Sequence, residues 1–241
     1  MFSRSQFRRI HERHLRGSVP HQVFTSGRLV YARDESLNEF FENMAFVGER
    51  DRVLLALRFG VEAVGSLHDI EKALYAHSDA VYAFIWLLET IYFLACIETV
   101  VHGQPVQREV IHQALACNPD VFKPLFIDLI GGKKDLQTLE QALRRADAYL
   151  EERALQIFEP LLSYLAEAGE VRGASEISRH FDERLQLSSG DFRLIMACEW
   201  LVAKGLLQKV CAPIKLTTKS RVLVDEPAYF YDGGTHHAEN N

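Results

Sequence analysis

The 241-residue sequence predicts a mainly α protein, in which a helical bundle with a short N-terminal strand precedes a smaller unit of three helices and two strands. Two observations support this fold class. Apolar residues recur every three or four positions over 54–74 and again over 136–150, which is the spacing of one helix face. Beyond residue 205, short β-rich runs replace this spacing and predict strands.

Composition and charge limit the function classes. Apolar residues make up 48% of the chain, enough for one large core or two modest ones. The net charge of -6 argues against a protein that binds polyanions over its whole surface. Basic residues nevertheless concentrate in two places: seven arginines face one acid within 1–33, and six basic residues face two acids within 191–221. Nucleic-acid contact is therefore expected at the N-terminal arm or in the C-terminal unit.

Breaks in the pattern divide the chain into five expected segments. Helices are expected to end at His102-Gly103 and at Gly131-Gly132, and Asn118 is a candidate N-cap. The segments are a basic arm with a short strand (1–33), a helical bundle (34–132), a connecting helix (133–153), the C-terminal unit (154–232) and a flexible tail (233–241).

The apolar run 81–101 is long enough to span a bilayer, which takes ~20 residues. Glu89 and Glu98 lie inside it, and carboxylates at such positions are costly in lipid. The run is therefore expected to be a buried bundle helix, with no membrane partner. The two glutamates are candidates for lining a pocket, and the alternative is that each is bonded to an Arg, a Tyr or the backbone of a neighbouring helix.

The cysteines indicate the compartment. None of the four forms a C-x-x-C pair, and each has apolar neighbours. This pattern is typical of small buried hydrophobic residues in a reducing, cytoplasmic compartment, and it favours neither a disulfide framework nor a metal site. Walker motifs, dinucleotide fingerprints, nucleophile elbows and zinc patterns are missing from the sequence, so no cofactor and no metal are predicted.

The C-terminal unit has a recognisable order of elements. "ALQIFEPLLSYLAEAGE", "GASEISRHFDERLQ" and "LSSGDFRLIMACEWLVAKG" predict three helices, and "LLQKV" and "IKLTT" predict two strands joined by Cys211-Ala212-Pro213. This order resembles a winged helix-turn-helix domain over about 154–223. The resemblance implies that the third helix is a recognition helix and that the strands form the wing.

This resemblance leaves two kinds of partner open. Leu194, Cys198 and Leu201 form the expected inward stripe of the third helix, which leaves Met196 and Trp200 near its outer surface. Those two residues would dock on another domain, a second subunit or a protein partner. In the other interpretation the unit binds DNA. Its basic residues would contact phosphates, and its recognition helix would discriminate weakly between base sequences. The candidate nucleic-acid-binding residues are Arg193, Lys204, Lys209, Lys215, Lys219 and Arg221.

A second resemblance covers about 20–132. Gly27 to Tyr31 and His102-Gly103-Gln104-Pro105 are similar to the strand end and the turn found in the helical substrate-binding half of polymerase-β-type nucleotidyltransferases. Those enzymes hold Mg²⁺ with an acidic pair that follows a Gly-Ser turn. Here Gly65-Ser66 precedes Asp69 and Glu71 at the wrong spacing, within a helix pattern. The resemblance therefore implies a binding module without the catalytic half.

A third pattern lies in the basic arm. "RIHERH", from Arg9 to His14, matches the Arg-hydrophobic-x-x-x-His pattern of HEPN-type ribonucleases, and a solvated basic helix is the alternative. The leading hypothesis is a non-catalytic regulator or adaptor, and of transcription if its partner is DNA. The other two hypotheses are an accessory module of a nucleotidyltransferase-like system and a ribonuclease that uses Arg9 and His14.

Overall fold

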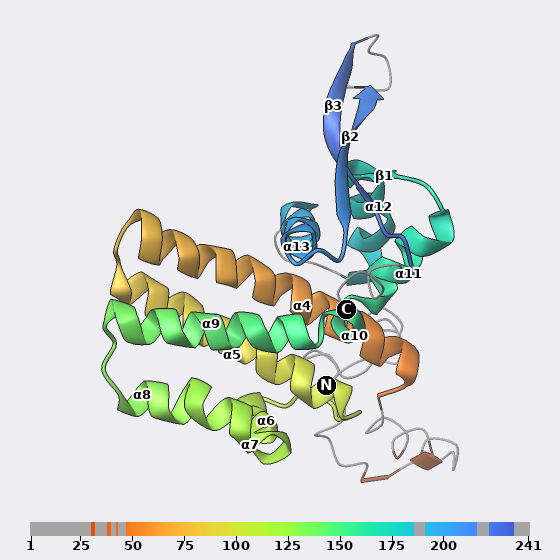
Figure 1. The fold of residues 1–241 in the computed structure, drawn as a ribbon. Coiled ribbons are helices and arrows are strands. Elements are labelled where there is room, and N and C mark those ends of the chain that lie inside the picture. The colour runs from red at the N-terminus through yellow and green to blue at the C-terminus, as the bar shows by residue number, and fades with distance from the viewer. Residues whose placement is uncertain are drawn as a thin grey trace, which may run out of the picture.

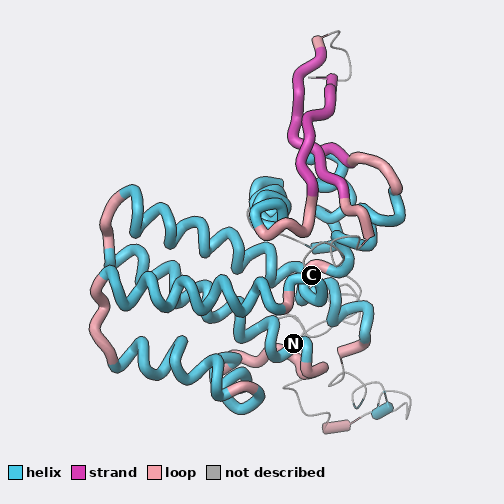
Figure 2. The backbone as a smooth tube through the Cα atoms, viewed as in Figure 1, coloured by secondary structure: helices cyan, strands magenta, loops and turns pink. Residues whose placement is uncertain are grey.

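The computed structural model describes residues 30–31, 38–39, 42, 47–185, 191–215 and 222–233. Over these residues the protein is mainly α-helical with one three-stranded antiparallel sheet, and the predicted fold class is confirmed at that level. A helical bundle lies on one side of the molecule, and a two-stranded ribbon projects from the smaller unit beside it (Figures 1 and 2).

Several predicted features lie outside the described residues. They include Arg9, His14, Lys219, Arg221 and most of the basic arm with its short strand. Val30 and Tyr31, at the end of that predicted strand, are described; both are exposed and belong to no helix or strand.

Three long helices form the centre of the bundle: α4 (Glu49–Glu71), α5 (Ala80–Val101) and α9 (Leu136–Glu152). The central helix α5 packs against both α4 and α9. A π-helical turn, η1 (Lys72–Ala76), extends α4 toward the turn into α5. The segment between α5 and α9 forms α6 (Val110–Cys117), α7 (Pro119–Phe122), a second π-helical turn η2 (Lys123–Asp128) and α8 (Leu129–Gly131).

The helix ends follow local chemistry. The Asp79 carboxylate accepts hydrogen bonds of 3.0 Å from the backbone N–H groups of Val81 and Tyr82, which caps α5. The helix ends before His102, and Gly103 follows with φ +74°, a conformation that glycine adopts without strain. The predicted helix stop at this point is confirmed.

Helix α5 is only partly the buried helix that the sequence predicts. Among the described residues, α5 is the one helix that is long enough and apolar enough to cross a membrane. In its most apolar stretch, 44% of the residues are buried. Its second half, from Leu94 to Val100, is buried throughout, but Val81, Tyr82 and Ile85 in its first half are exposed. The first half of the helix therefore faces the core on one side only, through Ala83 and Leu87, whereas the second half is buried throughout.

The C-terminal unit begins directly after the bundle. Its elements are α10 (Ala154–Ile157), α11 (Glu159–Ala168), β1 (Arg172–Gly173), α12 (Ala174–Leu185), α13 (Asp191–Ala203), β2 (Gln208–Lys215) and β3 (Leu223–Phe230). The sequence pattern predicted one helix where the structure has α10 and α11, because Pro160 starts a new helix in its first turn. The strands pair in the order β1–β3–β2.

The predicted hairpin turn at Cys211-Ala212-Pro213 is wrong. Strand β2 runs through these residues and pairs with β3, with Val210 opposite Ala228 and Pro213 opposite Asp225. An edge strand tolerates a proline because it needs hydrogen bonds on one side only, and β2 is such a strand. The ribbon is therefore longer than the sequence predicts.

Candidate functional site

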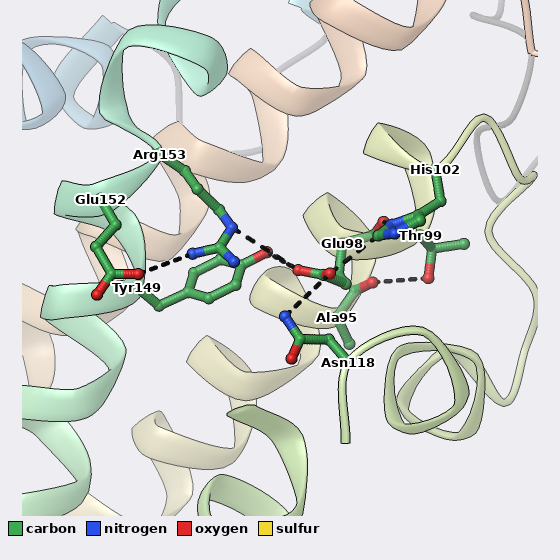
Figure 3. A network of polar contacts seen from close by, with 8 residues as sticks. All are labelled: Ala95, Glu98, Thr99, His102, Asn118, Tyr149, Glu152 and Arg153. Carbon is green, nitrogen blue, oxygen red and sulfur yellow. Dashed lines mark hydrogen bonds and ion pairs between the residues drawn. The ribbon is translucent and has the colours of Figure 1, made fainter. Parts of the chain in front are cut away.

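Glu98 is the centre of a polar network that joins α5 to the segments around it (Figure 3). Its Oε2 accepts a hydrogen bond of 2.7 Å from the Tyr149 hydroxyl, and its Oε1 accepts one of 3.2 Å from Asn118 Nδ2. Arg153 Nε lies 3.9 Å from Oε2, and His102 Nδ1 lies 3.7 Å from Oε1. Glu98 is only 4% exposed, so partners of this kind are needed to offset the cost of burying its charge.

The network also changes the pKa of Tyr149. Burial first, and then the negative charge of Glu98, raise the pKa of its hydroxyl, so the group stays protonated and continues to donate to Glu98. The Arg153 guanidinium lies 4.2 Å from the centre of the Tyr149 ring. Asn118 stands at the N-cap position of α7 but its side chain makes no capping bond, and its amide nitrogen donates to Glu98. The geometry is that of a carboxylate bonded to neighbouring helices.

Arg193 joins α13 to α4. Its Nη1 donates a hydrogen bond of 3.2 Å to the backbone oxygen of Glu62, and its Nε lies 3.5 Å from the Glu62 carboxylate. Its Nη2 lies 3.5 Å from Asp69 Oδ2. The side chain passes close to Gly65, where a Cβ atom would overlap Nη1 and lie 2.7 Å from Cδ. Only a glycine leaves room for the arginine at this point of α4.

Glu89 belongs to the surroundings of Arg193 and not to those of Glu98. Burial raises the pKa of the Glu89 carboxyl, the charge of Arg193 lowers it, and the charges of Glu62 and Asp69 raise it again. The two glutamates share one helix, as the sequence shows, but the structure places them in different electrostatic environments.

A second set of contacts joins α13 to α9. Trp200 Nε1 donates a hydrogen bond of 2.8 Å to Asp147 Oδ1, and Lys204 Nζ lies 2.6 Å from both Asp147 Oδ2 and Glu151 Oε2. The Trp200 ring also packs against Phe158, with ring centres 5.7 Å apart. The helix that the sequence marks as a recognition helix thus contacts the bundle at both of its ends.

Met196 and Trp200 both line a cavity of about 590 Å³ between α4, α9 and α13. These are the two residues that the sequence assigns to a partner-binding surface, and in the structure they face the bundle of their own chain. The inward stripe of α13, which is Leu194, Cys198 and Leu201, is fully buried as predicted.

The other two predicted cations that the structure describes, Lys209 and Lys215, lie on the ribbon. Lys209 Nζ is 2.6 Å from Glu199 Oε1, which also accepts a hydrogen bond of 2.6 Å from the Tyr229 hydroxyl. Burial alone would raise the pKa of Glu199, but the bonds from Lys209 and Tyr229 outweigh it and lower the pKa. Lys215 ends β2, where it is exposed opposite Leu223. Lys209 is thus ion-paired with a residue of α13, whereas Lys215 is exposed to solvent.

The acids that hold α13 were not predicted from sequence. Glu62 and Asp69 are seven residues apart on α4, and Asp147 and Glu151 are four apart on α9, so each pair lies along one helix face. Those spacings are a visible signal of an acidic stripe. Their partners Arg193 and Lys204 are more than fifty residues away, a pairing that spacing cannot reveal. Within the described residues, no group of three or more His, Cys, Asp and Glu side chains is placed to hold a metal ion.

Comparison with known proteins places the fold. Neither protein-family models nor curated protein sequences gave a match to this chain. Among solved structures, the chain is similar to a nucleotidyltransferase-like protein from Exiguobacterium sibiricum 255-15. The TM-score is 0.65 at 18% sequence identity, and the match covers 90% of this chain and 72% of that protein. The nucleotidyltransferase-like resemblance predicted from sequence is therefore confirmed for the fold.

Proposed function

We propose that the chain is a non-catalytic adaptor whose C-terminal unit is a winged helix-turn-helix domain that contacts a protein partner through its ribbon. The order of elements supports this: a helix, a short strand, two helices and a two-stranded ribbon, with the short strand paired to β3, the central strand of the sheet. This is the arrangement of winged helices, in which α13 takes the place of the recognition helix and β2–β3 that of the wing.

The proposal rests on the docking of Arg193 into α4. A DNA-binding helix-turn-helix uses the polar side chains of its second helix to read the major groove. Here Arg193 of that helix and Lys204, which directly follows its last residue, are paired with carboxylates of α4 and α9. The helix that would enter DNA is engaged by the bundle of the same chain, which leaves the ribbon for outside contacts.

The ribbon surface fits a protein better than a phosphate backbone. Val210, Val222, Leu223 and Val224 are large apolar residues exposed to solvent on it. Asp225 on β3 adds a negative charge that would repel phosphates. Protein interfaces combine an apolar centre with a polar rim, and the apolar residues of the ribbon with the charges beside them fit that pattern.

Site-specific photo-crosslinking tests this proposal. A photoreactive residue replaces Leu223 on the ribbon in cells that make the protein, and a matched one replaces Lys133, an exposed residue between α8 and α9. We expect one protein adduct of defined mass from position 223, lost when Val224→Asp is added, and none from position 133. A nucleic-acid adduct at position 223, or equal adducts at both positions, would contradict the proposal.

A DNA titration gives the complementary test. We expect a mixed-sequence duplex to show no saturable binding at about 0.05 M salt, where phosphate contacts are strongest. Saturable binding that weakens with salt and is lost in Lys215→Glu would favour the DNA-binding version of the winged helix.

A second candidate function is an accessory substrate-binding module of a nucleotidyltransferase-like system. The similarity in fold to the Exiguobacterium protein favours it. Such a module would bind a nucleoside triphosphate or its acceptor without transferring the nucleotide. Calorimetric titration with ATP and Mg²⁺ tests the nucleotide version, and we expect no heat of binding if the adaptor proposal is right.

A further inference from the structure

The cavity between the bundle and α13 has the size of a ligand site. Its volume of about 590 Å³ is within the range of sites that enclose small organic molecules. All three walls are helical: α4 with η1 on one side, α9 on the second and α13 on the third. Leu67, Leu143, Ile195 and Met196 make much of the lining apolar. The cavity therefore favours a ligand with a substantial apolar body.

Three aromatic residues line the same cavity, and two of them remain open to solvent. Tyr75 is 63% exposed and Phe192 is 69% exposed, and Trp200 is the third. Aromatic faces attract cations as well as apolar groups. The Trp200 ring already does so within the chain, because Lys204 Nζ lies 5.4 Å from its centre.

The polar groups of the cavity are mostly acidic. Asp147 and Glu199 line it, and each already has a lysine partner, Lys204 and Lys209. The guanidinium that lines the cavity, Arg144, is held by Glu140 at 2.7 Å. The cations near the cavity are thus neutralised by carboxylates, and a ligand phosphate would meet negative charge.

Glu71 is the acid of the cavity that still has bonding capacity. Over the described residues its carboxylate makes no hydrogen bond and no ion pair. Glu71 remains exposed to solvent, and partial burial of its carboxyl raises the pKa of that group, an effect that the neighbouring His68 opposes, Asp147 enhances and Lys204 opposes. A carboxylate in this position gains from a cation that replaces its lost water.

We propose that this cavity binds an amphipathic organic cation, with its ammonium group at Glu71 and an aromatic body between Met196 and Trp200. The apolar walls bury the body, the aromatic rings and Glu71 hold the charge, and the surrounding carboxylates exclude anions. This site is separate from the ribbon and does not depend on the partner that the ribbon contacts.

The test uses three probes with one ring and different charges: 2-phenylethylamine, 2-phenylethanol and phenylacetate. The chain has two tryptophans, so Trp86→Phe leaves Trp200 as the fluorescent reporter inside the cavity. At about pH 8 the amine and the Glu71 carboxylate are both charged. We expect saturable binding of the amine, about tenfold weaker binding of the alcohol and none of the anion.

Variants locate the binding, with calorimetry as the readout and circular dichroism to show that each variant folds. Glu71→Gln is expected to weaken amine binding about tenfold and to leave alcohol binding unchanged. Glu167→Gln removes an exposed acid of α11 outside the cavity and is expected to change neither. Met196→Trp fills the cavity and is expected to abolish binding of both probes.

Four results would overturn the proposal. They are equal binding of all three probes, tighter binding of phenylacetate, no binding of any probe up to about 10 mM, and amine binding that survives both Glu71→Gln and Met196→Trp.

Discussion

Two of the carboxylate clusters that join helices in the described part of the chain differ in how completely their partners surround them. The Glu98 cluster lies inside the bundle, where Tyr149 donates at 2.7 Å and Asn118 at 3.2 Å. The Arg193 cluster joins the bundle to the C-terminal unit, and its closest ion-pair distances to Glu62 and Asp69 are both 3.5 Å.

This difference between the two clusters suggests different roles, one in the stability of the whole fold and one in the packing of α13 against the bundle. In the Glu98 cluster a hydroxyl, an amide and a guanidinium all face one buried carboxylate, so loss of the carboxylate leaves every donor without this acceptor, and loss of a donor leaves the buried charge with fewer partners. In the Arg193 cluster one guanidinium faces two carboxylates at longer range, and part of its role is to fill the space over Gly65. The first cluster is expected to govern global stability and the second to govern how α13 sits on the bundle.

The largest effect is expected from Glu98→Ala. It leaves the Tyr149 hydroxyl and the Asn118 amide without their acceptor, and we expect the free energy of unfolding to fall by about 3 kcal/mol. Urea denaturation followed by circular dichroism measures this. Glu167→Gln, which changes an exposed acid of α11 away from the cluster, is the control and should stay within about 0.5 kcal/mol of the wild type.

Next in size is Gly65→Ala. The added methyl group displaces the Arg193 side chain, and we expect α13 to be less protected from hydrogen exchange by about 1–2 kcal/mol. Helix α5 should keep its protection, since the Glu98 cluster is untouched. Gly131→Ala, where a Cβ atom meets no neighbour within 4 Å, should leave α13 unchanged. Equal loss of protection in α5 and α13 would mean that the two clusters are not separable.

A smaller effect, which depends on the salt concentration, is expected from the ion pairs of Lys204. The Lys204 pairs with Asp147 and Glu151 are partly open to solvent, so Lys204→Ala should weaken α13 docking by only about 1 kcal/mol. That effect should shrink when salt is raised from about 0.05 M to about 1 M, because screening weakens exposed pairs first. The effect of Glu98→Ala should not change with salt, and hydrogen exchange measures both.

The smallest effect concerns thiol reactivity. Burial raises the pKa of Cys96 on α5 to about 12 and also raises the pKa of Cys198 on α13. Only the thiolate reacts, so at about pH 8 both should resist alkylation, while the exposed Cys211 on β2 reacts within minutes. Mass spectrometry after short labelling reads all three sites. Labelling of Cys198 but not Cys96 in Gly65→Ala would show that displacing Arg193 opens the C-terminal unit alone.

Features set by local chemistry were predictable from the sequence. The stripe of Leu194, Cys198 and Leu201 is buried because it lies on one face of α13, and helix α5 ends where His102-Gly103 indicates. Glu98 was also marked by its position in an apolar helix. Each of these depends on residues close together in the chain, where spacing and backbone preference decide the outcome.

Features set by distant contacts were not. Asn118 was expected to cap a helix, but a buried carboxylate twenty residues away takes its amide instead. The strand was predicted to stop at Val210, before a turn over Cys211-Ala212-Pro213, but pairing with β3 extends it to Lys215. The docking of α13 depends on Glu62 and Asp147, which are far from Arg193 and Lys204 in the chain, so the side of the helix that faces the bundle could not be inferred.

The hydrogen bond from Tyr229 and the ion pair from Lys209 fasten both strands of the ribbon to Glu199 of α13. Helix α13 and the ribbon are therefore expected to move as one rigid unit about the cavity. The eight residue pairs between β2 and β3 extend about 25 Å, so a tilt of α13 by about 10° would move the far end of these strands by roughly 4 Å. A small molecule that tilts α13 would therefore cause a larger displacement at the far end of the ribbon than at the cavity itself.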